Sequence, residues 1–222
     1  MNNIIPQKRL CYFVTATNTD VGKSFASKKL LSYYASMGYK VGYYKPIETA
    51  VIDDKPSDGI MLLKLAKELN RDFNVDIKEV VPYRFTLAAS PYVAKGDTII
   101  DIEYLKAQKE YLQTFCDVLI VEGAGGLMVP IEKEFFMIDL IKELQCKAIL
   151  ISPSNLGSIN DTMLSIKALK SHNIEFEWYI NLYKDKGSFF ETSYPFLKDY
   201  FSKIEFLDDL KTNNNSIYQK PL

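Results

Sequence analysis

Three successive residues, Gly22, Lys23 and Ser24, have the types and the spacing of a phosphate-binding loop. A glycine lets the backbone turn tightly, and successive N–H groups at a helix start can surround an anionic phosphate. The lysine can reach the β- and γ-phosphates of a nucleotide, and the serine hydroxyl can ligate Mg²⁺. The motif lies between an apolar run and a stretch with helical spacing, which is the context it requires. An ordinary helix start is the alternative interpretation.

A carboxylate and a glycine-rich segment follow a second apolar run. Residues 118–121 are apolar, and Glu122 and the segment 123–126 come directly after them. In an open parallel sheet, ligands bind beyond the carboxyl ends of the strands, so Glu122 is expected beside a nucleotide-bound Mg²⁺. The glycines would let a ligand approach the backbone. We expect an apolar strand that ends in this carboxylate and is followed by a glycine-rich turn. Taken alone, the segment is as compatible with an ordinary strand and flexible turn as with a ligand site.

A lysine stands at the carboxyl end of another apolar run. Lys45 follows residues 41–44, and an ammonium there can neutralise charge on a transferring phosphoryl group or on a substrate carboxylate. Asp58 precedes a glycine where helical spacing begins. Without further motifs, a surface lysine and a helix-capping carboxylate are the default interpretations. Asp58 becomes a candidate metal ligand only together with other ligands.

These side chains need a scaffold, which short apolar runs and longer amphipathic stretches indicate. The runs lack polar alternation, as is typical of strands buried on both faces. We expect strands at residues 10–14, 41–44, 118–121, 148–151 and 178–182. We expect helices at residues 22–37, 58–69, 102–115, 138–144 and 159–170, with Asp101 and Ser158 as N-caps and Gly38 as a stop. This alternation predicts an α/β fold with a mostly parallel central sheet and helices on both faces.

Composition limits the possible classes of protein. No linker or repeat divides the 222 residues, so we expect a single P-loop α/β domain over residues 1–222, with mobile tails at about 1–9 and 211–222. Lysine and arginine number 27 and acidic residues 28, a net charge of −1, which argues against binding nucleic acid by neutralising phosphates.

Cysteine usage and hydropathy indicate the compartment. Cys11, Cys116 and Cys146 are odd in number and lie in apolar runs, which favours reduced core thiols over a disulfide or a zinc site. The first residues lack the apolar core of a signal peptide. No segment approaches the roughly 18 uncharged apolar residues that span a bilayer. We therefore expect a cytoplasmic protein without a membrane partner.

Four blocks of sequence together resemble the dethiobiotin synthetases, a biotin-pathway family of the P-loop superfamily. The blocks are residues 15–24, 42–46, 121–126 and 155–160, and they occur in the family's order. Residues 90–92 resemble the family's Ser-Pro turn, and Asn181 matches its adenine-contacting asparagine. The resemblance spans about residues 10–182 and is far more specific than any single block.

The resemblance implies an ATP-dependent closure of a ureido ring. In the family, 7,8-diaminopelargonate and CO₂ form a carbamate, the γ-phosphate of ATP activates it as a mixed anhydride, and the second amine closes the ring. Such a reaction asks the protein mainly for positioning and charge stabilisation. By this resemblance Lys23 and Lys45 are catalytic, and Ser24, Asp58 and Glu122 hold Mg²⁺ through oxygen ligands.

The same resemblance implies the binding residues. Thr19 and Thr49 would orient the carbamate and the amine. In the family a homodimer builds each site, and a helix start of one subunit receives the substrate carboxylate bound to the other. The residues expected at that helix start are Leu156, Gly157, Ser158 and Asn160. The residues expected to bind the nucleotide are Asp20, Val21, Gly22, Lys23, Ser24, Phe25, Asp58, Glu122, Gly123, Ala124, Gly125 and Asn181.

The chain departs from the family pattern at four places. Ala16 replaces a glycine, Asp20 stands where many members have glutamate, and Leu182 stands where aspartate is frequent. The family's Ile-Pro-aromatic segment, which lines the base pocket, has its counterpart at residues 204–207 without the proline. We therefore expect the phosphate chemistry to be retained and the nucleotide base to be recognised weakly.

Other classes of protein share the phosphate-binding loop. Cobyrinate-type amidases also need a glutaminase domain, for which 222 residues leave no room. Partitioning or scaffold ATPases usually have an additional lysine early in the loop, and residues 15–21 contain none. A pure binding module would give Lys45 and Glu122 no purpose. Phosphate release that needs both diaminopelargonate and bicarbonate separates a synthetase from a partitioning ATPase.

Overall fold

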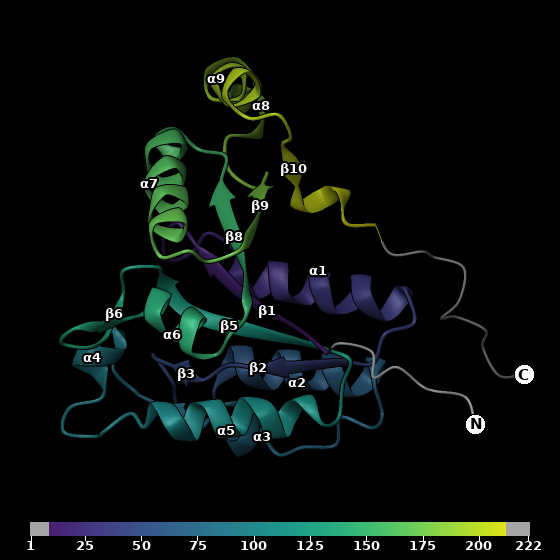
Figure 1. Ribbon diagram of the computed structural model, residues 1–222, viewed down its shortest axis with the longest axis vertical. Coiled ribbons are helices and arrows are strands. Elements are labelled where there is room, and N and C mark those ends of the chain that lie inside the picture. Colours follow the sequence, from purple (N-terminus) through teal and green to yellow (C-terminus); the bar gives the residue numbers. More distant parts are fainter. Residues whose placement is uncertain (1–8, 212–222) are drawn as a thin grey trace, which may run out of the picture.

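A six-stranded parallel sheet forms the centre of the computed structural model, which describes residues 9–211 (Figure 1). Its strand order is β10-β9-β8-β1-β5-β2, and all neighbouring strands are parallel. The strands are β1 (Leu10–Ala16), β2 (Val41–Tyr44), β5 (Val118–Gly126), β8 (Lys147–Pro153), β9 (Phe176–Asn181) and β10 (Glu205–Phe206). Because β1 lies between β5 and β8, the loop after β1 opens at the middle of the sheet, where ligands bind in such folds.

Helices cover both faces of this sheet (Figure 1). On one face α1 (Lys23–Ser36) and α2 (Ser57–Leu69) pack together, and on the other α5 (Ile102–Gln113) packs with α6 (Met137–Glu143). Helix α7 (Ser158–Ser171) packs against β8. The shorter elements are β3 (Ile47–Glu48), α3 (Ile77–Val80), β4 (Tyr83–Arg84), α4 (Pro91–Ala94), β6 (Pro130–Glu132), β7 (Phe135–Phe136), α8 (Lys186–Thr192), α9 (Tyr194–Tyr200) and η1 (Leu207–Asp209).

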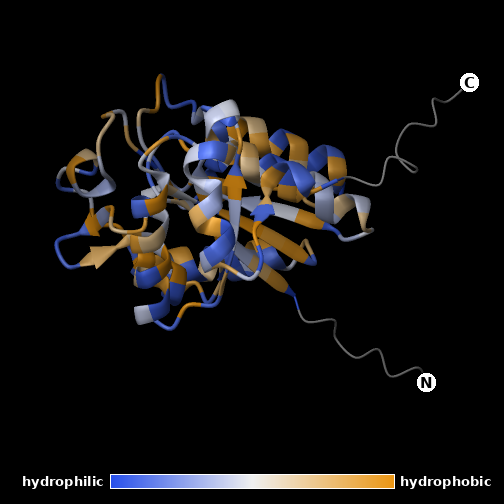
Figure 2. Cartoon of the chain, turned by 90° about the horizontal axis from the view of Figure 1, so that it is seen from above, coloured by the Kyte–Doolittle hydropathy of each residue, from blue (hydrophilic) through white to orange (hydrophobic). Residues whose placement is uncertain are grey.

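The apolar residues gather in the strands of the central sheet (Figure 2). The first four residues of β5, for example, have no exposed surface. Helices on both faces remove these strands from water, which explains why the strands are apolar throughout instead of alternating. Among residues 9–211, no helix has the length and hydrophobicity that crossing a membrane requires.

The structure confirms the α/β fold and the five expected strands and five expected helices, with boundaries that differ by a few residues. Asp101 caps α5 by accepting a hydrogen bond from the N–H of Tyr104. Gly38 follows the end of α1 with a positive φ of 88°, as expected of a helix stop.

Two expectations about local structure were wrong. Strand β5 continues through the glycine-rich segment to Gly126, which pairs with Ala16 on β1, so the segment is not a turn. The N-cap of α7 is Gly157 and Ser158 is its first helical residue, since Gly157 adopts the left-handed conformation there. The counterpart of the base-pocket segment forms β10 and η1 and extends the sheet beside β9.

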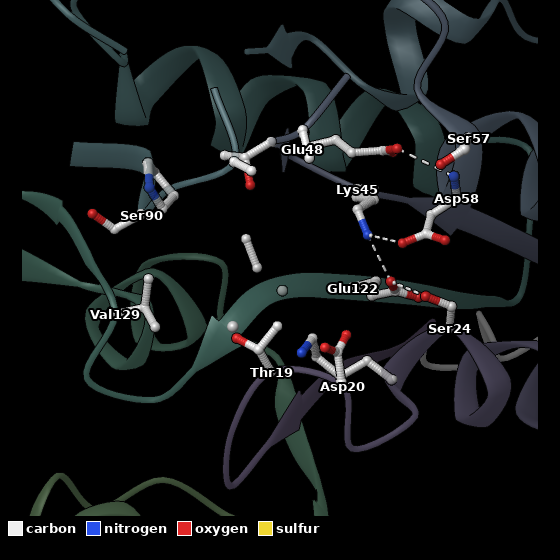
Figure 3. A pocket seen from close by; sticks show the side chains of 18 of the residues that line it. Thr19, Asp20, Ser24, Lys45, Glu48, Ser57, Asp58, Ser90, Glu122 and Val129 are labelled. Carbon is white, nitrogen blue, oxygen red and sulfur yellow. Dashed lines mark hydrogen bonds and ion pairs between the residues drawn. The ribbon is translucent and has the colours of Figure 1, made fainter. Parts of the chain in front are cut away.

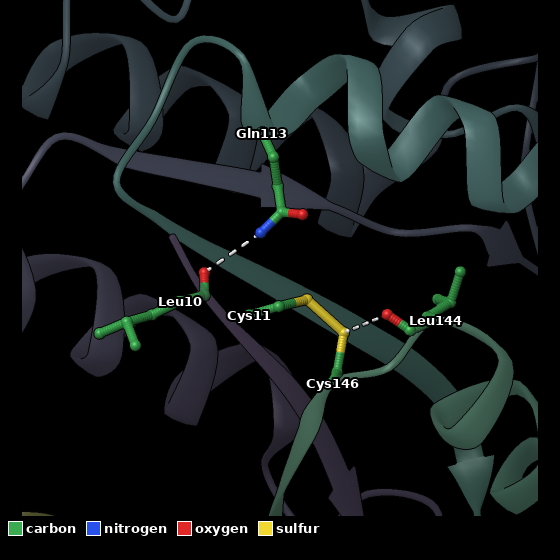
Figure 4. Close-up of a disulfide and its surroundings, with 5 residues drawn as sticks. All are labelled: Leu10, Cys11, Gln113, Leu144 and Cys146. Atoms are coloured by element: carbon green, nitrogen blue, oxygen red, sulfur yellow. Dashed lines mark hydrogen bonds between the residues drawn. A yellow bond between two sulfur atoms is a disulfide. The ribbon is translucent and has the colours of Figure 1, made fainter. Parts of the chain in front are cut away.

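The expectation of three reduced thiols was also wrong for two of them. Cys11 and Cys146 form a disulfide (Figure 4), while Cys116 is a buried free thiol. Tyr12 on β1 pairs with Lys147 on β8, so the residues directly before them, Cys11 and Cys146, lie close together. Their Cα atoms lie 4.9 Å apart, within the range that a disulfide bridges. The separation of 135 residues hid this neighbourhood in the sequence.

Candidate active site

A pocket of about 790 Å³ opens at the carboxyl ends of β1, β2 and β5 (Figure 3). Such a volume is ordinary for a small-molecule or nucleotide site. The phosphate-binding loop, the chain after β2, the start of α2 and the end of β5 contribute its walls. The residues from these segments that line it are Thr19, Asp20, Gly22, Lys23, Ser24, Phe25, Lys45, Glu48, Thr49, Ala50, Ser57, Asp58, Glu122, Gly123, Ala124 and Gly125.

The phosphate-binding loop enters α1 through Gly22, whose φ is 102°. This conformation favours glycine, and a Cβ added at Gly22 would lie 2.3 Å from Nδ2 of Asn181. Asn181, at the end of β9, donates this amide N–H to the carbonyl of Val21 at 2.9 Å. The loop is therefore held from the sheet beneath it, and no other residue fits at position 22 without strain.

A buried ion-pair cluster lies against the first turn of α1. Lys45 Nζ lies 2.7 Å from Glu122 Oε1 and 3.0 Å from Asp58 Oδ2 (Figure 3). Ser24 donates its hydroxyl to the same Glu122 oxygen at 2.9 Å, and Ser27 donates to the other oxygen at 2.6 Å. Glu122 has no exposed surface. A buried carboxylate needs such pairing. The partners of Glu122 are all hydrogen-bond donors: Ser24 and Ser27 on α1, and Lys45 directly after β2.

Burial and charge act against each other on the ionisable groups of this cluster. Burial would lower the pKa of Lys45, but Glu122 and Asp58 outweigh it and the pKa is raised, so the ammonium is kept. Burial would likewise raise the pKa of Asp58, and the charge of Lys45 outweighs it and lowers that pKa. Burial lowers the pKa of Lys23, which has no ion-pair partner at hydrogen-bond distance among the described residues. Lys23 is therefore the cation in the pocket that is free to hold an added anion.

The sequence patterns missed two residues at this site. Ser27 lies one helical turn after Ser24 on the same face of α1, and that spacing of three was the available signal. Glu48 is buried beside the pocket and accepts hydrogen bonds from the N–H groups of Asp58 and Gly59. Burial raises the pKa of Glu48. No spacing in the sequence indicated this contact, because Glu48 and α2 belong to different elements.

The structure brings most of the expected site residues together and leaves some apart. Thirteen of the expected residues line the pocket, from Thr19 through Lys45 and Asp58 to Gly125. Val21 is buried under the loop, and Asn181 holds the loop from behind. The expected carboxylate-binding residues, Leu156, Gly157, Ser158 and Asn160, lie at the start of α7 and do not line the pocket of their own chain.

The oxygen donors in the pocket fit a hard divalent cation. Ser24, Asp58 and Glu122 present a hydroxyl and two carboxylates around Lys45. Within residues 9–211 there is no cluster of three or more His, Cys, Asp or Glu side chains that could hold a metal. Mg²⁺ does not need one, because it commonly binds through one or two carboxylates together with substrate phosphates and water.

Comparison with known proteins shows relatives along most of the chain. The family model described as an AAA domain matches residues 11–180. The "ATP-dependent dethiobiotin synthetase BioD" of Sulfurovum sp. (strain NBC37-1) is 49% identical over 83% of this chain and 88% of its own. The protein of the same name from Wolinella succinogenes is 37% identical, over 88% of this chain and 92% of its own.

Solved structures with the same fold are more distant in sequence. The MinC:MinD cell division protein complex of Aquifex aeolicus matches with a TM-score of 0.55 and 21% identity, covering 89% of this chain and 79% of that chain. A plasmid partition protein from Borrelia burgdorferi matches with a TM-score of 0.54 and 13% identity, covering 91% and 95%. At these identities the likeness shows the fold alone. The identity and coverage of the sequence relatives show more: this chain belongs to the family of the ATP-dependent dethiobiotin synthetases.

Proposed function

We propose that this protein catalyses the ATP-dependent conversion of 7,8-diaminopelargonate and CO₂ to dethiobiotin. The observation that carries the proposal is the buried cluster in which Lys45 lies between Asp58 and Glu122 beside the phosphate-binding loop. A binding module has no need of this cluster, whereas a reaction between anions does. The name and 49% identity of the Sulfurovum relative support the same activity.

The proposed reaction joins one carbon and closes one ring. An amine of the substrate adds to CO₂ and loses a proton, giving a carbamate. A carbamate oxygen then attacks the γ-phosphorus of ATP, and ADP leaves. The second amine attacks the carbonyl carbon of the mixed anhydride and loses a proton, and phosphate leaves as the C–N bond closes the ring. Each step develops negative charge on oxygen, which fixed cations stabilise better than water does.

The residues lining the pocket suit these demands. Lys23 would bind the transferring phosphoryl group, and Lys45 would stabilise the carbamate and the developing anhydride. Thr19 and Thr49 line the pocket and carry hydroxyls that can orient the carbamate and the amine. The backbone from Asp20 to Phe25 and the segment 122–125 would bind the nucleotide. Because the pocket would hold all three reactants in place, a reaction between three molecules becomes a reaction within a single complex.

Mg²⁺ would be held by Ser24, Asp58 and Glu122. The cation, when bound, neutralises charge on the phosphates of ATP. The present contacts of these three side chains are all with one another or with donors inside the cluster. The protein therefore keeps their oxygens in one place before a ligand arrives, which lowers the cost of ordering them.

A homodimer would complete the substrate site. Leu156 is 83% exposed and lies next to Gly157, whose left-handed conformation starts α7. The N–H groups at a helix start suit a carboxylate, and this start does not line the pocket of its own chain. We propose that Leu156, Gly157, Ser158 and Asn160 of a second subunit bind the substrate carboxylate. Light scattering after size-exclusion chromatography should give twice the chain mass, and a monomer would contradict this arrangement.

One assay tests the proposed activity. Phosphate release and dethiobiotin formation, the latter by mass spectrometry, are measured with ATP and Mg²⁺ while diaminopelargonate and bicarbonate are omitted in turn. Both products should need both substrates. Phosphate release that ignores the two substrates would instead support a partitioning ATPase.

The cytoplasmic location stays a prediction, and the disulfide between Cys11 and Cys146 removes reduced cysteines as a reason for it.

A further inference from the structure

Glu48, three residues beyond Lys45 in the sequence, is a buried carboxylate on the short strand β3. It is 5% exposed and lines the pocket. Its Oε1 accepts the N–H of Asp58 at 3.1 Å (Figure 3), and its Oε2 accepts the N–H of Gly59 at 3.0 Å. Both carboxylate oxygens therefore bind the backbone at the start of α2.

Helix α2 has no capping side chain of its own. The residue at its N-cap position is Pro56, which makes no side-chain hydrogen bond to the first turn. The first N–H groups of a helix lack partners within the helix, so they need acceptors from elsewhere. In contrast, α5 is capped by the adjacent Asp101. Glu48 caps α2 although it belongs to a different element, β3, and its negative charge suits the positive end of a helix.

The contacts of Glu48 determine where Asp58 stands. Asp58 is the second residue of α2, and its backbone N–H is bound by Glu48 while its carboxylate binds Lys45. At the next residue, a Cβ added to Gly59 would lie 2.3 Å from Val81 Cγ2 and 3.2 Å from Glu48 Oε2. The start of α2 is thus seated closely on Glu48, and a shift of Glu48 would move the backbone from which Asp58 reaches the cluster.

We propose that Glu48 is a positioning residue for the reaction, which acts through Asp58 by holding the first turn of α2 against the pocket. The inference rests on the proposed function for its activity assay. Glu48 does not itself contact the transferring group. Its effect is to fix Asp58, and through it Lys45, at the distances that the chemistry requires. Replacing a residue that orients a metal ligand, without touching the metal or the substrate, typically lowers activity or metal affinity by about 10–100-fold.

The test is a double-mutant cycle on Glu48→Ala, Asp58→Ala and the double variant. For Glu48→Ala, kcat for dethiobiotin formation should fall by about 10–100-fold, and the Mg²⁺ concentration for half-maximal rate should rise severalfold. Because Glu48 acts through Asp58, the double variant should be no worse than Asp58→Ala alone. Losses that multiply in the double variant, or an unchanged Glu48→Ala protein, would overturn the proposal.

A capping residue far from the pocket is the matched control. Asp101→Ala removes the cap of α5, and its Tm should fall by about 2–4 °C while kcat and the Mg²⁺ dependence stay at wild-type values. If Asp101→Ala changed the Mg²⁺ dependence as Glu48→Ala does, a general loss of stability would explain both, and the special role of Glu48 would be refuted.

Two further measurements keep the proposal testable if a variant or the assay fails. Glu48→Gln preserves the size of the side chain, but its amide oxygen can accept from only one of the two N–H groups because its NH₂ is itself a donor. The kcat of this variant should therefore lie between those of wild type and Glu48→Ala. Wild-type kinetics in Glu48→Gln would count against the proposal. Calorimetric titration of ADP with and without MgCl₂ needs no turnover. Failure of wild type to make dethiobiotin would refute the proposed function, whereas an unaltered Mg²⁺ effect on ADP binding in Glu48→Ala would refute only the role of Glu48.

Discussion

Replacing Lys45 by methionine tests the buried charge cluster most directly. Methionine keeps most of the apolar stem of lysine and removes the ammonium, with its charge and its hydrogen-bond donors. Glu122 then loses the 2.7 Å contact with the ammonium and keeps only the hydroxyls of Ser24 and Ser27. Since Glu122 has no exposed surface, water cannot replace the lost partner.

The expected loss of stability follows from which contacts are buried. Removing one member of a buried pair costs about 3–5 kcal/mol. The contact with Asp58 adds little, because the Asp58 side chain is 41% exposed and pairs with such exposure contribute about 0–1 kcal/mol. The two serine hydroxyls still solvate Glu122, so we expect a value near the lower limit, about 3 kcal/mol. For a chain of this size, Tm would fall by about 6–12 °C.

A double variant tests whether the loss of stability comes from the unpaired charge of Glu122. Removing both charges, in Lys45→Met combined with Glu122→Gln, should restore stability to within about 1–2 kcal/mol of wild type. Turnover should be lost in both variants, since the ammonium is absent from each. Urea unfolding can be followed by the fluorescence of the single tryptophan, Trp178, which is buried. A Lys45→Met protein as stable as wild type, or a double variant that loses the sum of the single losses, would refute the reasoning.

Three further predictions follow from the same site and fold. Lys23→Ala should lower kcat by on the order of 10²-fold or more with little change in urea midpoint; near-native turnover would disprove its role. The kcat/KM values for ATP, GTP and CTP should agree within roughly 10–100-fold, because the Asn181 amide already donates to Val21 and one remaining hydrogen bond contributes only about 1 kcal/mol; an ATP preference of several thousandfold would contradict this. Burial raises the pKa of Cys116 to about 12, so Ellman's reagent at pH 8 should detect no rapidly reacting thiol in the native protein and one after unfolding without reductant. Three thiols after such unfolding would instead restore the interpretation of reduced cysteines.

The parts of this protein that depend on neighbouring residues could be predicted from the sequence. The loop around Gly22 is defined by its own backbone geometry and by the strand and helix on either side, all within one short segment. The apolar runs predicted strands because helices on both faces leave no polar positions in them. Asp101 caps the helix that begins directly after it, so its role depends on no distant residue.

Partnerships between distant segments were decided by the tertiary structure. Cys11 and Cys146 meet because β1 and β8 are neighbours in the sheet, although no local pattern reports which strands pair. Strand β5 extends through its glycines because Ala16 of β1 offers it a partner.

The site shows the same division. Its carboxylates and lysines could be named from motifs, but the placing of Lys45 between Asp58 and Glu122, and of Glu48 under the first turn of α2, could not. Motifs carry residue types and local geometry, whereas a buried charge takes its partners from whichever elements the packing brings within about 3 Å.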